Sequence, residues 1–437
     1  MRSLFHRGIA YLTGVIKKYR IKKVVTYLTL LAQKHNYIQL CLEISRLKSR
    51  RAIMELQAYR AEDLFEWVTG EGHDFTLLDV RNNEEFGRFK VEGPHQIKMI
   101  NVPYMEFIEK EDESVAQVQI PKEESIRIVC AKEGSAKYVG EILVNHGWKD
   151  VRYLAEGIKS WGNMLAPKLV ASGSGYELYQ FIRPGKASCS YGLIFEGEMA
   201  VFDPSRNAQF YRDFANEHGA RIVRTFETHL QADYISGSQQ IFADTGAQIV
   251  GHENDFKEAA FEYKKLDDYE VFTFSNGGPE IEAIHMPGHT PGSTSYLIDK
   301  KYMVSGDTVF ILSIGRPDLG GMAEDWSKLL YNTLKDKIAE LSDDLLILPG
   351  HYIEWAEANS QQMFVDTLGS IKNKNADIYG IDNEDEFVSF IKANMRKQPD
   401  EYAEIRKVNA GLLAVDDEDQ EIMDLGKNEC AASMHGK

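Results

Sequence analysis

Short hydrophobic runs alternate with segments of helical periodicity along most of this chain from residue 54 onwards. Strand-like runs occur at 76–80, 126–129 and 151–154, and helical patterns occur at 61–67 and 137–143. Alternation of this kind predicts a small sheet with helices on both faces. We therefore expect an α/β domain over residues 54–166.

A second alternating region begins at residue 175 and extends to about residue 380. It opens with a hairpin pattern, because the hydrophobic runs 191–195 and 199–202 flank Glu196-Gly197-Glu198. The segment 165–175 contains Pro167 and a repeated Ser-Gly pair, and we predict that it is the linker between the two domains. Later strand-like runs lie at 221–226, 248–250, 280–285, 301–304 and 345–348.

The two ends of the chain differ from these regions. Residues 1–53 carry 12 Lys and Arg and one acidic residue, Glu43, and they predict a basic helical extension. This extension fits a membrane-surface or partner-binding helix, a solvated extension, or an upstream start codon assigned in error, with Met54 as the true start. Residues 381–437 predict a helical and acidic C-terminal tail.

Composition narrows the class of protein. The net charge of −17 makes nucleic acid an improbable partner. The longest apolar run near the N-terminus, 24–32, is far shorter than the roughly 20 residues that span a bilayer, so no transmembrane segment is expected. The 4 cysteines form no Cys-x-x-Cys pair, which favours a reducing cytoplasm over a disulfide framework.

Three hydrophobic runs far apart in the chain end in residues that bind metals: His229, His289 and Asp307. Two imidazoles and one carboxylate leave open positions on a metal, and this set suits one Fe(II) and O2 chemistry. Zinc is the alternative ion, although it is redox-silent. The sequence therefore predicts a mononuclear metal site.

Cys130 ends another apolar strand and precedes a helical pattern. A thiolate there would face backbone N–H groups and the positive end of a helix, which predicts a lowered pKa and a nucleophilic sulfur. The neighbouring Lys132, Gly134 and Ser135 are the candidate substrate-binding residues. A small buried hydrophobic residue is the alternative role for Cys130.

The first domain resembles a rhodanese domain over residues 54–166. The resemblance rests on Leu77-Leu78-Asp79-Val80-Arg81 with Glu85-Phe86, then 93–97, 100–103, the cysteine loop, and 153–158 with Trp161. It implies that Cys130 carries a sulfane sulfur as a persulfide, and that Asp79 and Arg81 form a buried ion pair. Glu133 and Ser135 stand where the commonest form of the family loop has glycine and arginine, which disfavours an anionic donor such as thiosulfate.

The second domain resembles the metallo-β-lactamase superfamily. Thr-His-x-x-x-Asp at 228–233, Pro-Gly-His-Thr-Pro-Gly-Ser at 287–293, Ser-Gly-Asp at 305–307 and Leu-Pro-Gly-His at 348–351 occur in the order of that superfamily. The resemblance implies an αββα sandwich. Its two-metal hydrolases of the glyoxalase II type carry a His-x-His-x-Asp-His motif. Here Gln231 and Tyr234 replace two of those histidines, which weakens the dinuclear assignment.

The persulfide dioxygenase branch of that superfamily is more similar to this chain. The resemblance implies that His229, His289 and Asp307 hold one Fe(II), and that Arg316, in Gly-Arg-x-Asp at 315–318, lies near the thiol substrate. The implied reaction converts a low-molecular-weight persulfide and O2 into sulfite and a thiol, coupled to sulfur transfer at Cys130. The residues expected around the iron are Gln231, Asp233, Tyr234 and His351.

Two alternative functions stay open. One is a metal-dependent thioesterase or hydrolase of the glyoxalase II type. The other is a sulfur carrier whose lactamase-like domain has lost catalysis. A sulfur-carrier protein and a second copy of the chain are the possible macromolecular partners. We expect a structural role for Cys189, and for His252 and His285 either a structural role or one next to the metal ligands. We also expect a flexible tail around Cys430 and His435.

Overall fold

The computed structural model describes residues 56–432 apart from 73, 174, 319, 320 and 396. The described residues from Ala58 onwards belong to one compact unit. The predicted basic extension, residues 1–53, and His435 lie outside the described residues.

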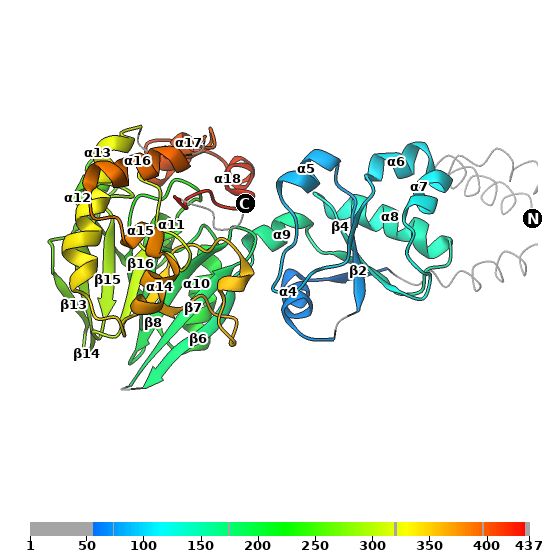
Figure 1. Ribbon diagram of the computed structural model, residues 1–437. Helices are drawn as coiled ribbons and strands as arrows, with labels where there is room; N and C mark the ends of the chain where they lie inside the picture. The colour runs from blue at the N-terminus through cyan, green and yellow to red at the C-terminus, as the bar shows by residue number, and fades with distance from the viewer. Residues whose placement is uncertain (1–55, 73, 174, 319–320, 396, 433–437) are drawn as a thin grey trace, which may run out of the picture. The chain divides into compact units, whose positions relative to one another are not determined.

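The first domain is a five-stranded sheet in the order β1-β5-β4-β2-β3. The pairs around β2 and β4 are parallel, as expected for alternating strands and helices. The helices lie on both sides of this sheet (Figure 1). The elements are β1 (Gln57–Tyr59), α4 (Ala61–Thr69), β2 (Phe75–Asp79), α5 (Asn83–Arg88), β3 (Met99–Asn101), α6 (Tyr104–Glu109), α7 (Glu111–Gln117), β4 (Ser125–Val129), α8 (Glu133–Asn145), β5 (Val151–Leu154) and α9 (Ile158–Asn163).

The second domain contains two sheets. The first has seven strands in the order β12-β11-β10-β9-β8-β7-β6, and the second has six in the order β13-β14-β15-β16-β17-β18. The strands are β6 (Ala166–Gly173), β7 (Tyr176–Arg183), β8 (Ser188–Phe195), β9 (Glu198–Phe202), β10 (Arg221–Phe226), β11 (Gln248–Gly251), β12 (Lys264–Lys265), β13 (Val271–Phe274), β14 (Gly277–His285), β15 (Thr294–Ile298), β16 (Tyr302–Gly306), β17 (Leu346–Pro349) and β18 (Asp366–Thr367).

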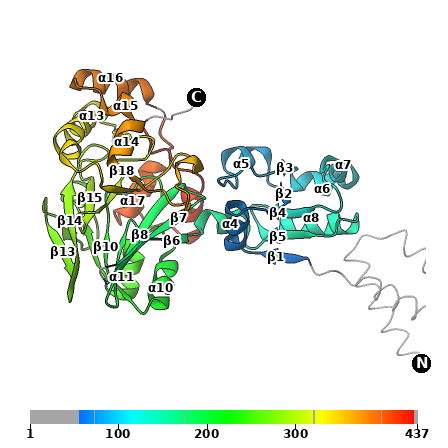
Figure 2. The same cartoon turned by 60° about the horizontal axis from the view of Figure 1, so that its bottom comes forward.

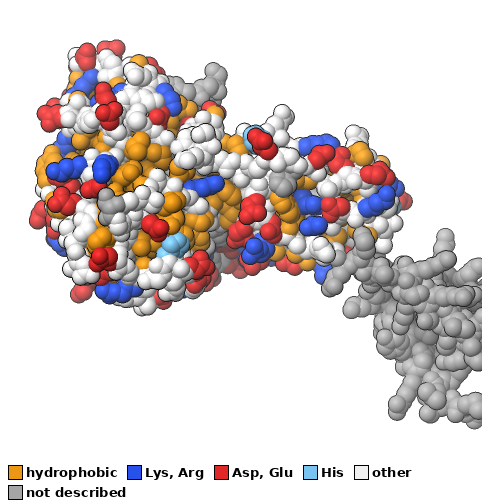
Figure 3. All heavy atoms as spheres, turned by 90° about the horizontal axis from the view of Figure 1, so that it is seen from below, with side chains coloured by type: hydrophobic (Ala, Val, Ile, Leu, Met, Phe, Trp, Pro, Cys, Tyr) orange, Lys and Arg blue, Asp and Glu red, His pale blue; other side chains and the backbone are white. Residues whose placement is uncertain are grey.

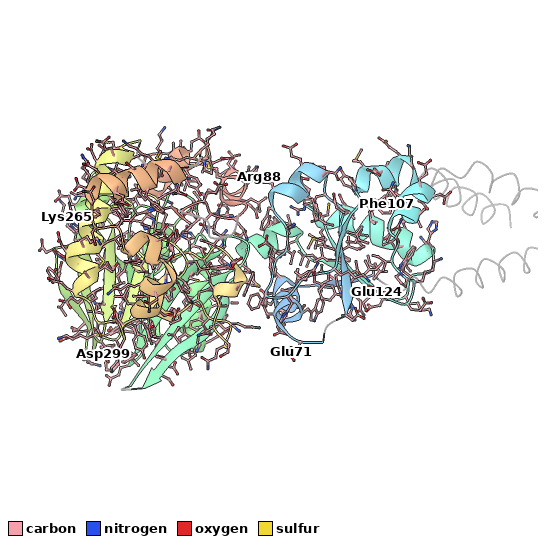
Figure 4. All side chains as sticks on the ribbon, viewed as in Figure 1. Glu71, Arg88, Phe107, Glu124, Lys265 and Asp299 are labelled. Atoms are coloured by element: carbon pink, nitrogen blue, oxygen red, sulfur yellow. The ribbon has the colours of Figure 1, made fainter. Side chains whose placement is uncertain are left out.

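The two sheets pack face to face through a core of large apolar side chains. Phe202 on β9 stacks on Phe226 on β10 with ring centroids 5.0 Å apart, and both rings contact Tyr296 on β15 of the other sheet. The Tyr176 hydroxyl donates a hydrogen bond to the carboxylate of Asp299 (3.3 Å), a residue labelled in Figure 4. Side chains from both inner faces therefore form one buried layer.

Helices cover the outer faces of both sheets (Figures 1 and 2). Tyr211 and Phe214 on α10 pack with Phe181 and Val201 of the first sheet in a separate buried cluster. The predicted αββα sandwich is confirmed. Its helices are α10 (Ala208–Glu217), α11 (Ser238–Thr245), α12 (Glu253–Phe256), α13 (Ala323–Asn332), α14 (Leu368–Lys374), α15 (Ala376–Tyr379), α16 (Glu384–Asn394), α17 (Tyr402–Asn409) and α18 (Asp417–Asp424).

The prediction that 165–175 is a linker was wrong for most of that segment. Residues Ala166–Gly173 form β6, which pairs antiparallel with β7. Pro167 is tolerated because β6 is the edge strand of its sheet. The first Ser-Gly pair, Ser172-Gly173, forms the end of β6, shortly before β7 begins at Tyr176.

On the face seen in Figure 3, acidic and basic side chains are interspersed rather than gathered by sign. Among the described helices, none combines the length and the hydropathy that crossing a membrane requires.

Candidate metal centre and cysteine site

The three predicted metal ligands lie just beyond strand ends at one edge of the sandwich. His229 follows β10, His289 follows β14, and Asp307 follows β16 directly. Strand β16 pairs in parallel with β17, whose end leads to His351. The structure therefore brings together residues that are as far apart as 229 and 351 in the sequence.

The ligand atoms of these three residues converge. The Nε2 atoms of His289 and His229 lie 3.5 and 4.0 Å from Oδ2 of Asp307. All three atoms are buried and have no hydrogen-bond partner among the described residues, and together they form a group able to hold a metal ion. Buried polar atoms left unpaired are costly, and a metal ion bonded at roughly 2.0–2.2 Å to each would satisfy them. The residues present therefore fit the expected metal.

Each histidine is oriented by a hydrogen bond at its other nitrogen. Nδ1 of His289 donates to the Arg316 carbonyl (2.8 Å). Nδ1 of His229 lies 2.9 Å from Oγ1 of Thr228, which itself donates to Asp203 (2.8 Å) and must accept from the imidazole. Both Nε2 atoms thus present a lone pair to the metal position, as metal-binding histidines require.

Burial sets the protonation of these ligands. It lowers the pKa of His229 to about 4 and also lowers the pKa of His289. For Asp307, burial opposes ionisation, but the charge of His351 and its hydrogen bond to the carboxylate outweigh burial and lower the pKa of the carboxyl. Two neutral imidazoles and one carboxylate are therefore ready to bind a cation at neutral pH.

Asp255 ties two of the ligand loops together, a role that no sequence motif indicated. Its carboxylate accepts hydrogen bonds from the backbone N–H of Leu230 (2.9 Å), the hydroxyl of Thr290 (2.7 Å) and the backbone N–H of Gly292 (2.8 Å). It therefore fixes the loops that carry His229 and His289 relative to each other.

Gly315 marks a close backbone approach. A Cβ at this position would lie 1.9 Å from the Asp307 carbonyl oxygen and 2.9 Å from Nδ1 of His289. A side chain there would therefore push two ligands apart. This explains the glycine in the Gly-Arg-x-Asp segment.

His351 lies between two carboxylates. Its Nδ1 is 2.8 Å from Oδ1 of Asp307, and its Nε2 is 2.9 Å from Oδ2 of Asp233. Burial opposes protonation of this imidazole, but the two carboxylates outweigh it and raise the pKa of His351 to about 10. His351 and Asp233 are thus next to the ligand triad, as the sequence predicted.

Gln231 and Tyr234 are buried close to the triad, but neither replaces a histidine ligand. Nε2 of Gln231 lies 3.5 Å from Nδ1 of His229, on the side of the ring away from the ligand atom. The Tyr234 hydroxyl donates to the Asp203 carbonyl (3.4 Å), and burial raises its pKa well above the ordinary value. A neutral phenol is a poor metal ligand.

Asn409 is another residue that no sequence motif indicated. Its side-chain amide donates hydrogen bonds to the backbone carbonyls of Gln231 and Tyr234.

The Arg316 side chain is engaged by its neighbour. Its Nε and Nη2 bind the two carboxylate oxygens of Asp318 (2.6 and 2.7 Å), and the residue is buried. Its backbone carbonyl orients His289. The structure thus assigns Arg316 a positioning contact, and its predicted contact with substrate stays a prediction.

The placement of Cys430 in a flexible tail was wrong. Cys430 is 1 % exposed, and its carbonyl accepts from the backbone N–H of Arg316 (2.8 Å). The next residues pair with the loop before Arg316, through the Gly315–Ala431 bridge and the Ala432 N–H to the Ile314 carbonyl. Cys430 thereby forms a group with Asp233 and His351. A lone cysteine near the C-terminus gives no sequence signal for this position.

The cysteine of the first domain lies between β4 and the N-terminus of α8, as predicted. Cys130 is buried, and its sulfur interacts with the backbone N–H groups of Lys132 and Ala131 and with the Ser135 side chain. Burial nevertheless outweighs these interactions and raises the pKa of the thiol. The expected lowering of its pKa was therefore wrong: the N–H groups are present, but desolvation is larger.

The rest of the Cys130 loop contacts the neighbouring loop on one side and borders open space on another. The Glu133 carboxylate accepts from the backbone N–H of Glu156 (3.1 Å), so it is tied to the following loop. A Cβ added at Gly134 would meet nothing within 4 Å, which leaves open space beside the loop. Asp79 and Arg81 form the expected buried ion pair (2.7 Å).

Of the other candidates, Cys189 is a buried residue of β8, as expected. His252 and His285 stack on each other with ring centroids 4.0 Å apart and are in neither ligand group. Their predicted structural role agrees with this arrangement.

Comparison with known families assigns both domains. The rhodanese-like domain model matches residues 61–164, and the metallo-beta-lactamase superfamily model matches residues 184–351. The chain is 27% identical over 222 residues to hydroxyacylglutathione hydrolase of Brucella anthropi, covering 49% of this chain and 78% of the relative. It is 28% identical over 191 residues to human mitochondrial persulfide dioxygenase ETHE1, covering 41% and 70%.

Solved structures are similar to the same region. A metallo-beta-lactamase of Staphylococcus aureus has 26% identity and a TM-score of 0.49, covering 55% of this chain and 74% of its own. ETHE1 of Myxococcus xanthus has 22% identity and a TM-score of 0.46, covering 54% and 99%. The motifs, the two matched families and the ligand geometry agree: this chain joins a rhodanese-like domain to a domain of the metallo-beta-lactamase superfamily.

Proposed function

We propose that this protein is an iron-dependent persulfide dioxygenase with a sulfurtransferase domain. The observation that carries the proposal is the triad of His229, His289 and Asp307, whose three unpartnered ligand atoms converge. Two imidazoles and one carboxylate on one face of a metal are typical of Fe(II) oxygenases. When bound, Fe(II) would supply the redox chemistry with O2 that zinc lacks.

The reaction consumes one persulfide, one O2 and one water and gives one thiol and one sulfite with its protons. The outer sulfur of the persulfide is oxidised, O2 is reduced, and the bond between the two sulfurs breaks. In this chain, His229 and His289 would hold the metal as neutral donors and Asp307 would offset part of its charge. All three are at most 2 % exposed, and exclusion of bulk water strengthens their electrostatic interactions.

Cys130 would exchange sulfane sulfur with a small persulfide or a carrier protein. In this transfer the Cys130 sulfur attacks the outer sulfur of the donor, the donor's sulfur–sulfur bond breaks, and the donor leaves as a thiol that takes up the proton of Cys130. The backbone N–H groups at Lys132 and Ala131 would stabilise the developing negative charge. A neutral persulfide donor suits a buried thiol better than an anionic one.

A metal-dependent thioesterase is the second candidate. The second group, formed by Asp233, His351 and Cys430, favours it because hydrolases often use two metals. A relative named hydroxyacylglutathione hydrolase points the same way. The free thiols Cys130, Cys189 and Cys430 fit either activity in the cytoplasm, which we propose as the compartment.

Purification under anaerobic conditions, followed by O2-uptake and thioester-hydrolysis assays, tests the proposal. We expect bound iron and O2 uptake that depends on glutathione persulfide or coenzyme A persulfide, with sulfite formed in equal amount. Hydrolysis of S-lactoylglutathione without persulfide-dependent O2 uptake would contradict the proposal and establish the thioesterase. Transfer of sulfur without either activity would leave a sulfur carrier.

A further inference from the structure

The ligand triad is closed to solvent, although the proposed reaction needs a persulfide to reach it. His229, His289 and Asp307 are at most 2 % exposed, and Arg316, which we expect beside the thiol substrate, is 3 % exposed. A substrate of the size of glutathione persulfide cannot contact these groups unless one wall of the site moves. The wall that lies against Arg316 is the segment 428–432, which we call the C-terminal strap.

The C-terminal strap uses the groups that a substrate would need. Nη1 of Arg316 donates to the Glu429 carbonyl (3.3 Å), and the backbone N–H of Arg316 donates to the Cys430 carbonyl (2.8 Å). The Cys430 thiol interacts with the carboxylate of Asp307, and its sulfur lies within 4.8 Å of a ring nitrogen of His351. A sulfur atom of the chain itself therefore lies beside the triad, where a thiol substrate would bring its own.

The closed strap leaves polar atoms of the site without partners. Among the described residues, Oδ2 of Asp307 and Oδ1 of Asp233 are buried and accept no hydrogen bond. A thiol such as that of Cys430 is a weak donor and a weak acceptor, so it satisfies such atoms poorly. Since unpaired buried carboxylate oxygens are costly, opening that admits water or a polar ligand removes part of this cost.

Hydrogen bonds, rather than burial of large side chains, hold the C-terminal strap in place. The side-chain amide of Asn428 donates to the carbonyls of Lys186 and Ala187 (3.1 Å each), and its oxygen accepts from the backbone N–H of Cys430 (3.2 Å). The buried residues that follow, 431–432, are alanines, and hydrophobic stabilisation grows with the apolar area removed from water. The strap therefore depends strongly on Asn428.

Gly426 lies between α18 and the C-terminal strap and provides a pivot. Its φ is +102°, in the region that favours glycine, and a Cβ there would meet nothing within 4 Å. The backbone thus has space and conformational freedom to rotate at this residue. Rotation there would lift the strap while α18 stays in place.

We propose that the C-terminal strap is an autoinhibitory segment: it closes the substrate site, keeps the Cys430 thiol in the place of the substrate sulfur, and is displaced when a small thiol or persulfide binds. The inference rests on the proposed function and adds a control of access to the same site. Displacement breaks hydrogen bonds only, and no covalent bond or oxidation state changes. The apparent affinity for substrate is reduced in proportion to the fraction of open molecules.

Labelling of Cys430 with N-ethylmaleimide in the full-length protein, followed by mass spectrometry of its peptide, tests the strap. We expect slow labelling in the native sequence and labelling about 10-fold faster in Asn428→Ala, which loses the three side-chain hydrogen bonds of the strap. The matched control Asn101→Ala loses two hydrogen bonds to the carbonyls of Asp79 and Arg81 and should label like the native protein. Cys189, buried in β8, should stay slow in every folded variant.

The Michaelis constant gives a second readout, which a merely structural role of the strap would not lower. In Asn428→Ala, the KM for glutathione persulfide should fall by the factor by which labelling of Cys430 rises, because both follow the open fraction. The kcat should stay at the native value, since saturating substrate opens every molecule. Ala432→Pro, which lacks the N–H that donates to the Ile314 carbonyl, should change labelling and KM in the same directions.

Equal labelling rates in the native protein and both strap variants would overturn the proposal, because the strap would then not open. Faster labelling with a higher KM would also overturn it, since the strap would then help to bind the substrate. If Asn428→Ala fails to fold, which labelling of Cys189 reveals, Ala432→Pro decides. Labelling does not depend on O2 uptake, and in a hydrolase the KM for S-lactoylglutathione replaces that for the persulfide, so this proposal and the proposed function fail separately.

Discussion

The cysteine loop of the rhodanese-like domain and the metal centre of the lactamase domain differ in how their parts are gathered. The groups that interact with the Cys130 sulfur include Ala131, Lys132 and Ser135, all within five positions of it. The metal centre draws its ligands from loops as distant as 229 and 307, and its supports include Asp255. One centre is built by local sequence, and the other depends on how the whole sandwich folds.

The largest effect is expected from removing a ligand of the non-local centre. In His289→Ala, the triad loses one of its three donors, so metal binding and persulfide-dependent O2 uptake should fall below detection. Sulfur transfer at Cys130 should stay at the native rate. Metal analysis measures the bound metal, and an oxygen electrode measures O2 uptake. Thiocyanate or thiol-acceptor assays measure the sulfur transfer.

His218→Ala is the matched control for that variant, since the His218 ring contacts Tyr179 and the Phe214 carbonyl outside both ligand groups. It should keep its metal and its O2 uptake. If His289→Ala retained full O2 uptake, the ligand assignment would be wrong.

A substitution in the cysteine loop of the rhodanese-like domain should have the opposite effect: sulfur transfer should be lost and the metal should stay bound. Cys130→Ser keeps the size of the side chain but removes the sulfur nucleophile, so formation of a protein persulfide should be lost. Metal content should not change. Mass spectrometry after incubation with a persulfide donor detects the added sulfur, and its appearance elsewhere in this variant would show that Cys130 is not the acceptor.

An intermediate effect on metal affinity is expected from a substitution of Asp255, which holds the loops that carry two of the ligands. Asp255→Asn keeps the shape but leaves one acceptor oxygen where three hydrogen bonds now end. Metal affinity should fall about 10- to 100-fold, as for other residues that orient ligands. Competition with a chelator measures the affinity, and Glu253→Gln, a change at an exposed ion pair with Lys265, serves as control. An unchanged metal affinity would show that Asp255 does not support the metal ligands.

The smallest effect is expected at Tyr234, which the sequence places where related hydrolases have a histidine. Tyr234→Phe removes one long hydrogen bond to the Asp203 carbonyl and should cost about 1 kcal/mol of stability or less. Metal content should be unchanged. Thermal unfolding and metal analysis test this, and loss of metal would instead identify a phenolate ligand.

The same contrast explains what the sequence could predict. Local patterns located the strands and Cys130, because each depends on neighbours along the chain. The buried Asp79–Arg81 pair was implied by the resemblance to rhodanese domains. The linker prediction failed because Pro167 and glycine are compatible with an edge strand as well as with a loop. The pKa of Cys130 was predicted in the wrong direction, since burial is a property of the folded domain.

Residues that act across the fold were the ones missed. The motifs identified the ligand triad, but Asp255, Asn409 and Cys430 belong to no pattern, and only tertiary contacts bring them to the centre. The surroundings of His351 also could not be predicted from the sequence. A motif located this histidine, but only the fold shows that two carboxylates enclose it.

Exchange of the metal in the native protein tests the central claim most directly. Metal-free protein should regain persulfide-dependent O2 uptake with Fe(II), forming one sulfite for each O2 consumed, and should regain none with Zn(II), because zinc is redox-silent. Recovery of thioester hydrolysis with Zn(II), and no O2 uptake with Fe(II), would contradict the account and identify a hydrolase.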